Sequence, residues 1–289
     1  MGKKINRDYI IHLEDKYGAQ IYKDRLVLEK DVYQSRGLMS PYKNIDMLEE
    51  RIRGLASLLN QQEGDSIMRH PRHDLLLVIN RTVGAEAAYL LSCGDYVQRQ
   101  LDIVSQFVKS GDRVLNIGAG LGVIAMKAAQ VSGEPVLAVE PNEDLHSIIV
   151  KNAALNKVDV VVEKGCVVAG QKEGETDFYI APQLWSSSIF VESQEEGEGE
   201  VKKVPVVSLE KLCAQHQANF LFLDVQGAEI GLLDDTELKP FERVIVRIHT
   251  SLIGEKATAS VVNAVMQQGF ELVDIQGWCF CFEKKEEKV

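Results

Sequence analysis

A run of apolar residues that leads directly into three closely spaced glycines limits most strongly how this chain can fold. Residues 114–117 read Val-Leu-Asn-Ile, and residues 118–122 read Gly-Ala-Gly-Leu-Gly. The pattern predicts a buried strand, a tight turn and a helix over 123–131, whose N-terminus presents free N–H groups. A plain strand–helix turn has the same outline, so the turn needs support from other residues.

The spacing of these glycines favours one class of ligand over another. Dinucleotide sites use G-x-G-x-x-G, whose third glycine would fall at residue 123, but this chain has Val123 there. The G-x-G-x-G form suits adenosylmethionine, which has no pyrophosphate for the turn to hold. Several nucleotide-binding folds share the turn, so it does not by itself identify the cofactor.

The chain from residue 93 onward alternates between strand-like and helix-like segments. After the first strand, we expect strands at 136–139, 158–162, 204–207, 220–224 and 244–248, with an extra one at 177–180. We expect helices at 145–155 and 209–215, a further helix that ends near residue 108, and a helical stretch between the strands at 220–224 and 244–248. The alternation predicts an α/β fold with a doubly wound, mostly parallel, seven-stranded sheet.

Both ends of the chain depart from this alternation. Residues 271–275 and 278–282 flank Gln276-Gly277 and predict a C-terminal antiparallel hairpin. Such a hairpin separates the sheet of class I methyltransferases from the plain dinucleotide-binding sheet. Residues 1–92 read as an accessory region of mixed structure, with a helix over 44–59, a strand at 75–79 and apolar patches at 10–13 and 26–28.

The composition excludes several classes of function. A formal net charge of −11 repels phosphate backbones, so we expect no nucleic-acid partner. The sequence has neither a membrane-spanning apolar run nor the apolar core of a signal peptide, so we expect a cytoplasmic protein without a membrane partner. The five cysteines form no C-x-x-C pair, and His70 and His73 lack metal partners in the sequence, so we predict no metal.

Glu140 follows the second predicted strand, 22 residues after Gly118, in Val139-Glu140-Pro141-Asn142. A carboxylate at a strand's carboxyl end can accept hydrogen bonds from both hydroxyls of a ribose. Pro141 removes one backbone donor and stiffens the turn. A surface glutamate beside a turn is the alternative, and NAD sites also use an acid at this spacing, so this residue leaves the cofactor open.

Asp224 ends another apolar strand, at the sheet edge where open α/β folds place ligands. With it, an ordered set of motifs is complete: Gly94-Asp95-Tyr96, Lys109-Ser110-Gly111-Asp112, the glycine turn, Val139 to Asn142, Asn152 with Asn156, Ser186-Ser187-Ser188, Val207 to Leu212 and Asp224-Val225-Gln226-Gly227-Ala228-Glu229. Over roughly residues 94–250 the chain resembles the FkbM family of methyltransferases, most of which methylate hydroxyl groups of natural products and sugars.

The resemblance implies S-adenosylmethionine as cofactor, bound at Gly118, Gly120 and Glu140, and a ligand-facing Asp224. Two residues depart from the family pattern. Asn116 stands where an acid usually serves the cationic methionine end of the cofactor, and Gln226 stands where the family has Glu. Each keeps a carbonyl acceptor and loses a charge, which weakens a desolvated hydrogen bond by about 1 kcal/mol or more.

The candidate catalytic residues are Asp224, beside the methyl-transfer centre, and His249, a candidate base because imidazole is the side chain suited to proton transfer at neutral pH. A histidine that only caps a strand end is the alternative for His249, and Ser186 to Ser188 are candidates to line the acceptor pocket. The predicted cofactor-binding residues are Asn116, Gly118, Ala119, Gly120, Glu140, Pro141, Asn142, Cys166 and Asp224.

Three functions follow from these patterns. The first is methyl transfer to a hydroxyl of a small molecule or glycan, with a homodimer left open. The second is a methyltransferase-like binding module without turnover, which Asn116 and Gln226 suggest. The third is an NAD-dependent oxidoreductase, which Val123 and the terminal hairpin disfavour.

Overall fold

The computed structural model describes residues 41–181, 187–189 and 199–285. The chain divides into two compact units, Met1–Leu58 and Leu59–Val289. The helix predicted over 44–59 is confirmed as α3 (Pro41–Gln61). The apolar patches at 10–13 and 26–28 lie outside the described residues, and the domain boundary expected near residue 92 stays a prediction.

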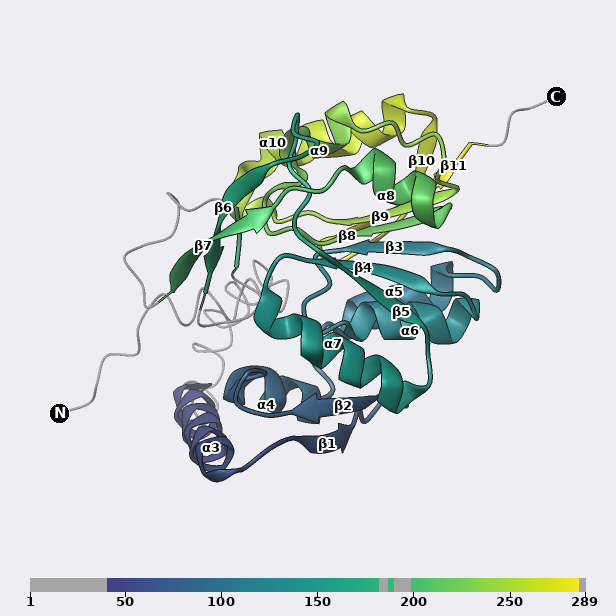
Figure 1. The fold of residues 1–289 in the computed structure, drawn as a ribbon. Coiled ribbons are helices and arrows are strands. Elements are labelled where there is room, and N and C mark those ends of the chain that lie inside the picture. Colours follow the sequence, from purple (N-terminus) through teal and green to yellow (C-terminus); the bar gives the residue numbers. More distant parts are fainter. Residues whose placement is uncertain (1–40, 182–186, 190–198, 286–289) are drawn as a thin grey trace. The chain divides into compact units, whose positions relative to one another are not determined.

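A seven-stranded sheet forms the centre of the second unit (Figure 1). Its strands, in spatial order, are β10 (Phe270–Gln276), β11 (Cys279–Lys284), β9 (Arg243–Arg247), β8 (Phe220–Leu223), β3 (Val114–Ile117), β4 (Val136–Glu140) and β5 (Val160–Lys164). Every strand except β11 runs in the same direction. The predicted doubly wound, mostly parallel sheet with a terminal hairpin is therefore confirmed.

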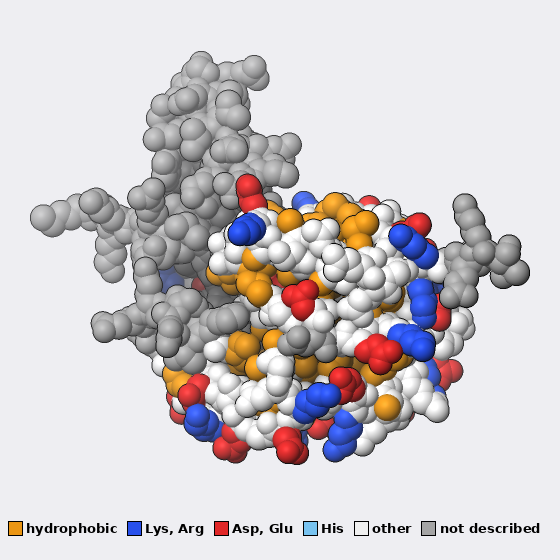
Figure 2. All heavy atoms as spheres, turned by 90° about the horizontal axis from the view of Figure 1, so that it is seen from above, with side chains coloured by type: hydrophobic (Ala, Val, Ile, Leu, Met, Phe, Trp, Pro, Cys, Tyr) orange, Lys and Arg blue, Asp and Glu red, His pale blue; other side chains and the backbone are white. Residues whose placement is uncertain are grey.

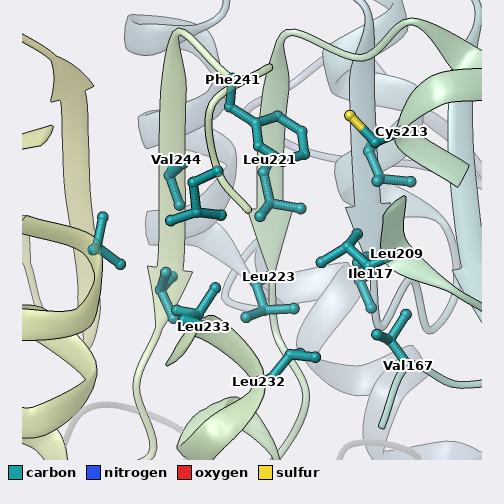
Figure 3. Close-up of a cluster of buried hydrophobic side chains, with 14 of the residues drawn as sticks. Ile117, Val167, Leu209, Cys213, Leu221, Leu223, Leu232, Leu233, Phe241 and Val244 are labelled. Carbon is teal, nitrogen blue, oxygen red and sulfur yellow. The ribbon is translucent and has the colours of Figure 1, made fainter. Parts of the chain in front are cut away.

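Helices cover both faces of this sheet (Figure 1). One face carries α5 (Gln98–Phe107), α6 (Val123–Ser132) and α7 (Glu143–Asn156), and the other carries α8 (Leu209–His216), α9 (Glu229–Asp235) and α10 (Thr250–Gln267). Under α8 to α10, Ile117, Leu221, Leu223 and Phe241 pack into an extensive apolar cluster (Figure 3). Strands β3 and β8, in the centre of the sheet, are buried on both faces, which explains why their sequences are almost entirely apolar.

Some elements differ from the sequence prediction. The segments predicted at 177–180 and 204–207 form a separate antiparallel sheet of β6 (Glu175–Ile180) and β7 (Glu200–Pro205) and do not join the main one. The hairpin turn falls at Gly277-Trp278, one residue later than predicted, because Gly277 adopts the positive φ that the turn requires. Strand β5 begins two residues later than predicted.

Two helices lie outside the segments predicted as helical. The first, α4 (Ala85–Cys93), buries Ala87, Ala88, Leu90 and Leu91 on one face, a short apolar spacing that was not recognised in the sequence. The second, α10, is interrupted at Gly254, whose φ of 80° is not helical. Among the described residues, no helix is long and apolar enough to cross a membrane, and all five cysteines are unpaired.

A small antiparallel sheet of β1 (Ser66–Arg69) and β2 (Leu76–Ile79) is attached to α7 by side-chain amides. Asn152 Oδ1 accepts a hydrogen bond from the Val78 N–H at 2.7 Å, and Asn156 Oδ1 accepts one from the Leu76 N–H at 2.8 Å. The Asn152 amide also donates to the carbonyl of Leu121, in the glycine turn, at 3.1 Å. These two asparagines therefore take the place of a neighbouring strand for β2.

A buried ion pair lies at the opposite end of the sheet from the glycine turn. Arg243, the first residue of β9, donates to Asp112 Oδ1 at 2.6 Å and to the carbonyl of Phe107 at 2.7 Å. Asn219 adds a hydrogen bond to the same carboxylate at 3.2 Å. Asp112 and Arg243 are both buried, so each charge is compensated by the other and not by water.

Candidate functional site

The glycine turn is fixed between the ends of β4 and β8. The N–H groups of Gly118 and Ala119 both donate to the carbonyl of Val139, at 3.0 and 3.1 Å. Gly118 has a φ of 78°, and a Cβ at this position would overlap the carbonyl oxygen of Asp224. Glycine at 118 is therefore required so that the turn and the end of β8 can touch.

Glu140, the last residue of β4, turns its carboxylate toward the glycine turn. Oε2 accepts the N–H of Gly120 at 2.6 Å, and Oε1 accepts the N–H of Asn142 at 2.9 Å. Burial raises the pKa of Glu140 to about 7, although both backbone hydrogen bonds act in the opposite direction. Each oxygen keeps a second lone pair, so the group can still accept hydroxyl donors.

Asn116, in β3, holds a buried acceptor without a partner. The side chain is 1% exposed, and among the described residues no group donates to its Oδ1. A buried, unpaired carbonyl is unfavourable unless a donor arrives. Gly120 lies three residues beyond the strand, and among the described residues a Cβ there would meet only the Tyr96 hydroxyl, at an ordinary 3.6 Å.

Asp224 lies in the turn after β8 and contacts the end of β9. Arg247 Nη1 lies 3.3 and 3.2 Å from the two carboxylate oxygens of Asp224. His249 Nε2 lies 3.4 Å from Asp224 Oδ1 but does not meet hydrogen-bond geometry. The two predicted catalytic residues are thus brought together by the structure, and their catalytic roles remain proposals.

The other ring nitrogen of His249 faces Glu229, the first residue of α9. Glu229 is fully buried, and its Oε1 lies 3.2 Å from His249 Nδ1 and accepts the His249 backbone N–H at 2.7 Å. Its Oε2 accepts the N–H of Gly227 at 2.8 Å. Burial acts to raise the pKa of Glu229, but the hydrogen bonds and charge of His249 outweigh burial and lower it.

Tyr96, between α4 and α5, lies near both halves of the site. Burial raises the pKa of its phenol, and the negative charges of Asp224 and Glu140 raise it further. Burial acts to lower the pKa of the Arg247 guanidinium, but the charge and hydrogen bonds of Asp224, with smaller effects of Cys279 and Tyr96, outweigh burial and raise this pKa. The sheet edge therefore carries a neutral phenol together with a matched carboxylate and guanidinium.

The remaining predicted residues lie around this edge. Asn142 caps α7 by accepting the Asp144 N–H at 3.1 Å, directly after Pro141. Burial raises the pKa of the Cys166 thiol to about 12, so the thiol stays protonated. Ser188 Oγ donates to the carbonyl of Gln226 at 3.2 Å, whereas Ser186 lies outside the described residues.

His70 and His73 lie close to each other, with ring centroids 5.2 Å apart. Burial lowers the pKa of His70 to about 4, and the positive charges of His73 and Arg72 add to this effect. In the part of the chain that the structure describes, no group of three or more acidic, histidine or cysteine side chains could hold a metal ion.

The strand order, the single antiparallel strand β11 and the acid at the end of β4 define the class I S-adenosylmethionine-dependent methyltransferase fold. The model of the methyltransferase FkbM domain matches residues 116–272, more than half of the chain. The chain belongs to the FkbM methyltransferase family.

Curated relatives match a shorter part of the chain. A ribosomal protein L11 methyltransferase from Thermotoga neapolitana is 30% identical over 84 residues, which are 29% of this chain and 31% of that protein. Another, from Caldicellulosiruptor saccharolyticus, is 33% identical over 73 residues, 25% of this chain and 24% of that protein. The chain thus matches less than a third of the length of these relatives.

Similar solved structures include two methyltransferases. A tRNA (uracil-54, C5)-methyltransferase from Pyrococcus abyssi, in complex with S-adenosyl-L-homocysteine, has a TM-score of 0.41 and 12% identity, over 76% of this chain and 44% of that chain. The ribosomal protein L11 methylase of Lactobacillus delbrueckii subsp. bulgaricus has a TM-score of 0.38 and 13% identity, over 66% of this chain and 79% of that chain.

The residues present fit S-adenosylmethionine, the cofactor of this class. The unpaired Oδ1 of Asn116 would accept a hydrogen bond from the cofactor's ammonium group, and Glu140 would accept hydrogen bonds from the ribose hydroxyls. Space beside Gly120 leaves the backbone of the turn open to a ligand.

Three residues of this edge were missing from the sequence prediction. Glu229 lies within a motif that the family resemblance includes, but its pairing with His249 joins two segments 20 residues apart. Arg247 precedes His249 by two residues, and Tyr96 comes from the loop before α5. Only the spacing of Arg247 and His249 along one strand end could have indicated that both face the same edge.

Proposed function

We propose that this chain transfers a methyl group from S-adenosylmethionine to a hydroxyl of a small molecule or glycan. The main support is the proximity of Asp224 and His249, 3.4 Å apart at the carboxyl ends of β8 and β9. Transfer to oxygen needs an aligned acceptor and a group that takes the hydroxyl proton. A buried imidazole with an unpaired ring nitrogen meets the second need.

Each side chain has a separate task in this proposal. The bound cofactor supplies the activated methyl group. Asn116 and Glu140 hold its two ends, and the glycine turn lets it approach the backbone. Arg247 holds the carboxylate of Asp224 through both oxygens, so that Asp224 presents a fixed surface to the acceptor. His249 takes the proton.

The charge of the protein favours a small or sugar acceptor over nucleic acid. The net charge of −11 gives a phosphate backbone no general attraction. On the described part of the face in Figure 2, acidic and basic side chains lie side by side and do not separate into a basic stripe. A neutral hydroxyl compound needs no such stripe.

Calorimetric titration tests the cofactor part of the proposal. We expect micromolar binding of S-adenosylmethionine and S-adenosylhomocysteine, and none of NAD. Glu140→Ala should weaken binding by about 1–3 kcal/mol, because a hydrogen-bonding charged group is lost. Glu143→Ala, which removes an exposed acid three residues further on, is the matched control and should leave binding unchanged. If neither sulfur compound binds at millimolar concentration, the proposal fails.

Methyl transfer itself is tested with radiolabelled cofactor and a panel of acceptors. We expect label in hydroxylated small molecules or oligosaccharides, and loss of transfer in His249→Gln. Label only in RNA or protein would correct the acceptor class. Tight cofactor binding without transfer to any acceptor would favour the binding module without turnover, for which Asn116 and Gln226 are the motivation.

A further inference from the structure

We infer that Glu229 is a positioning residue that fixes His249 in the Nδ1–H tautomer and so leaves Nε2 as the proton acceptor at the sheet edge. The inference rests on the proposed function for its chemistry. Its structural part, the tautomer of His249, stands on hydrogen bonds that do not involve cofactor or acceptor.

The Glu229 carboxylate has only donors around it. Oε2 accepts the Gly227 N–H, and Oε1 accepts the backbone N–H of His249, so both oxygens are already used as acceptors. Ionisation of the carboxyl is supported by its lowered pKa. An ionised carboxylate can only accept, so the contact of 3.2 Å with His249 Nδ1 requires a proton on that nitrogen.

The other ring nitrogen has no equivalent partner. Among the described residues, Nε2 of His249 makes no hydrogen bond, although the residue is 8% exposed. Its neighbour Asp224 is already occupied by Arg247, which donates toward both carboxylate oxygens. The charge of Asp224 is thus compensated by the Arg247 guanidinium. His249 Nε2 then keeps a free lone pair at the carboxyl edge of the sheet.

The proton balance of the transfer follows from this arrangement. The hydroxyl proton moves to Nε2 while the acceptor oxygen bonds to the methyl carbon and the carbon–sulfur electron pair goes to sulfur. His249 becomes an imidazolium between Glu229 and Asp224, and later releases the proton to solvent. Glu229 takes no proton at any point, because its part is to hold the ring and stabilise the charge that forms.

Nitrogen-15 NMR of the histidine rings tests the inference without any ligand. The chain has six histidines, and the signals of His249 are identified by their loss in His249→Gln. At about pH 8 we expect the Nδ1–H tautomer for His249. His146 is an internal reference for the opposite tautomer. Its Nε2 contacts the carbonyl of Glu140 at 2.7 Å, so this nitrogen must carry the proton and donate.

Two variants separate the influence of the two carboxylates. Glu229→Gln should lower the ratio of Nδ1–H to Nε2–H at least about tenfold, as expected for loss of a charge-assisted hydrogen bond. Asp224→Asn should leave the tautomer unchanged. Circular dichroism and thermal unfolding establish that each variant is folded, and if Glu229→Gln does not fold, the wild-type spectrum and Asp224→Asn decide.

The inference is overturned if wild-type His249 carries its proton on Nε2 or on both nitrogens at this pH. It is also overturned if Glu229→Gln keeps the wild-type tautomer, or if Asp224→Asn changes it. Binding of S-adenosylhomocysteine is measured on the same samples. Failure of binding with the expected tautomer refutes the proposed function alone, whereas normal binding with the wrong tautomer refutes only the role of Glu229.

Discussion

Asn152 joins Val78 to Leu121: its side chain accepts the N–H of the first at 2.7 Å and donates to the carbonyl of the second at 3.1 Å. One buried amide thus connects β2 with the turn that carries Gly118 and Gly120. The relationship explains why an asparagine, with both a donor and an acceptor, occupies this position in the middle of α7.

Replacement of Asn152 by alanine should destabilise the fold. The variant leaves the buried N–H of Val78 without an acceptor, which costs about 1–3 kcal/mol. Chemical denaturation measures this free energy. Ser147→Ala, at an exposed position of the same helix, should change it by no more than about 0.5 kcal/mol. Equal stability of the two variants would contradict the bridging role.

The ion pair between Asp112 and Arg243 should matter far more than exposed pairs. Asp112→Ala leaves the buried guanidinium without its carboxylate, and we expect a loss of about 3–5 kcal/mol of unfolding free energy. The exposed pair of Lys203 and Asp177, at 2.9 Å, provides the comparison, and Lys203→Ala should cost at most about 1 kcal/mol. If Asp112→Ala loses as little unfolding free energy as Lys203→Ala, Arg243 has found other hydrogen-bond acceptors.

Glu140 should make cofactor binding release a proton. In the free protein burial holds its pKa at about 7, and hydroxyl donors from a ribose favour the ionised form and lower this pKa. At about pH 6 binding should therefore release up to one proton, and at about pH 8.5 almost none. Calorimetry of S-adenosylhomocysteine in two buffers of different ionisation enthalpy measures the release, which Glu140→Gln should abolish.

The same group should affect stability with a defined sign. The pKa of Glu140 is higher in the folded protein than its ordinary value of 4.5, so the folded state binds the proton more tightly. The contribution is fully present below about pH 4.5 and is lost as the pH rises through about 7. Wild-type stability should therefore fall relative to Glu140→Gln over this interval, and parallel curves would contradict the raised pKa.

Asn116→Asp should change binding and stability in opposite directions. A carboxylate in place of the unpaired amide carbonyl would give charge assistance to the ammonium of S-adenosylmethionine, and we expect about fivefold tighter binding, or roughly 1 kcal/mol. Without ligand, the same carboxylate is buried and unpaired, so the free variant should melt earlier. Weaker binding would place the ammonium away from residue 116.

Local patterns were sufficient to predict the main sheet and which strand ends meet at one edge. The glycine turn and the apolar runs that lead into Glu140 and Asp224 are contiguous signals along the chain. Because the carboxyl ends of parallel strands share one edge, the proximity of Gly118, Glu140 and Asp224 follows from the order of the strands.

The contacts of His249 could not be predicted in this way. Its pairing with Glu229 depends on how α9 leaves the turn after β8, and the positive φ of Gln226 and Gly227 sets that path. No periodicity encodes such a turn. The separate sheet of β6 and β7 was missed for a related reason, since an alternating segment specifies a strand but not its partner.

The overlap that any side chain at Gly118 would have with Asp224 bears on how mutational data for such domains are interpreted. An alanine scan would assign residue 118 to cofactor affinity, although the substitution pushes on the carboxyl end of a different strand. Loss of turnover and loss of affinity would then appear together and could not be ascribed to separate residues. The contact also couples the two positions in evolution. A side chain at residue 118 is tolerated only if the backbone at Asp224 takes a different path, so neither can change without the other.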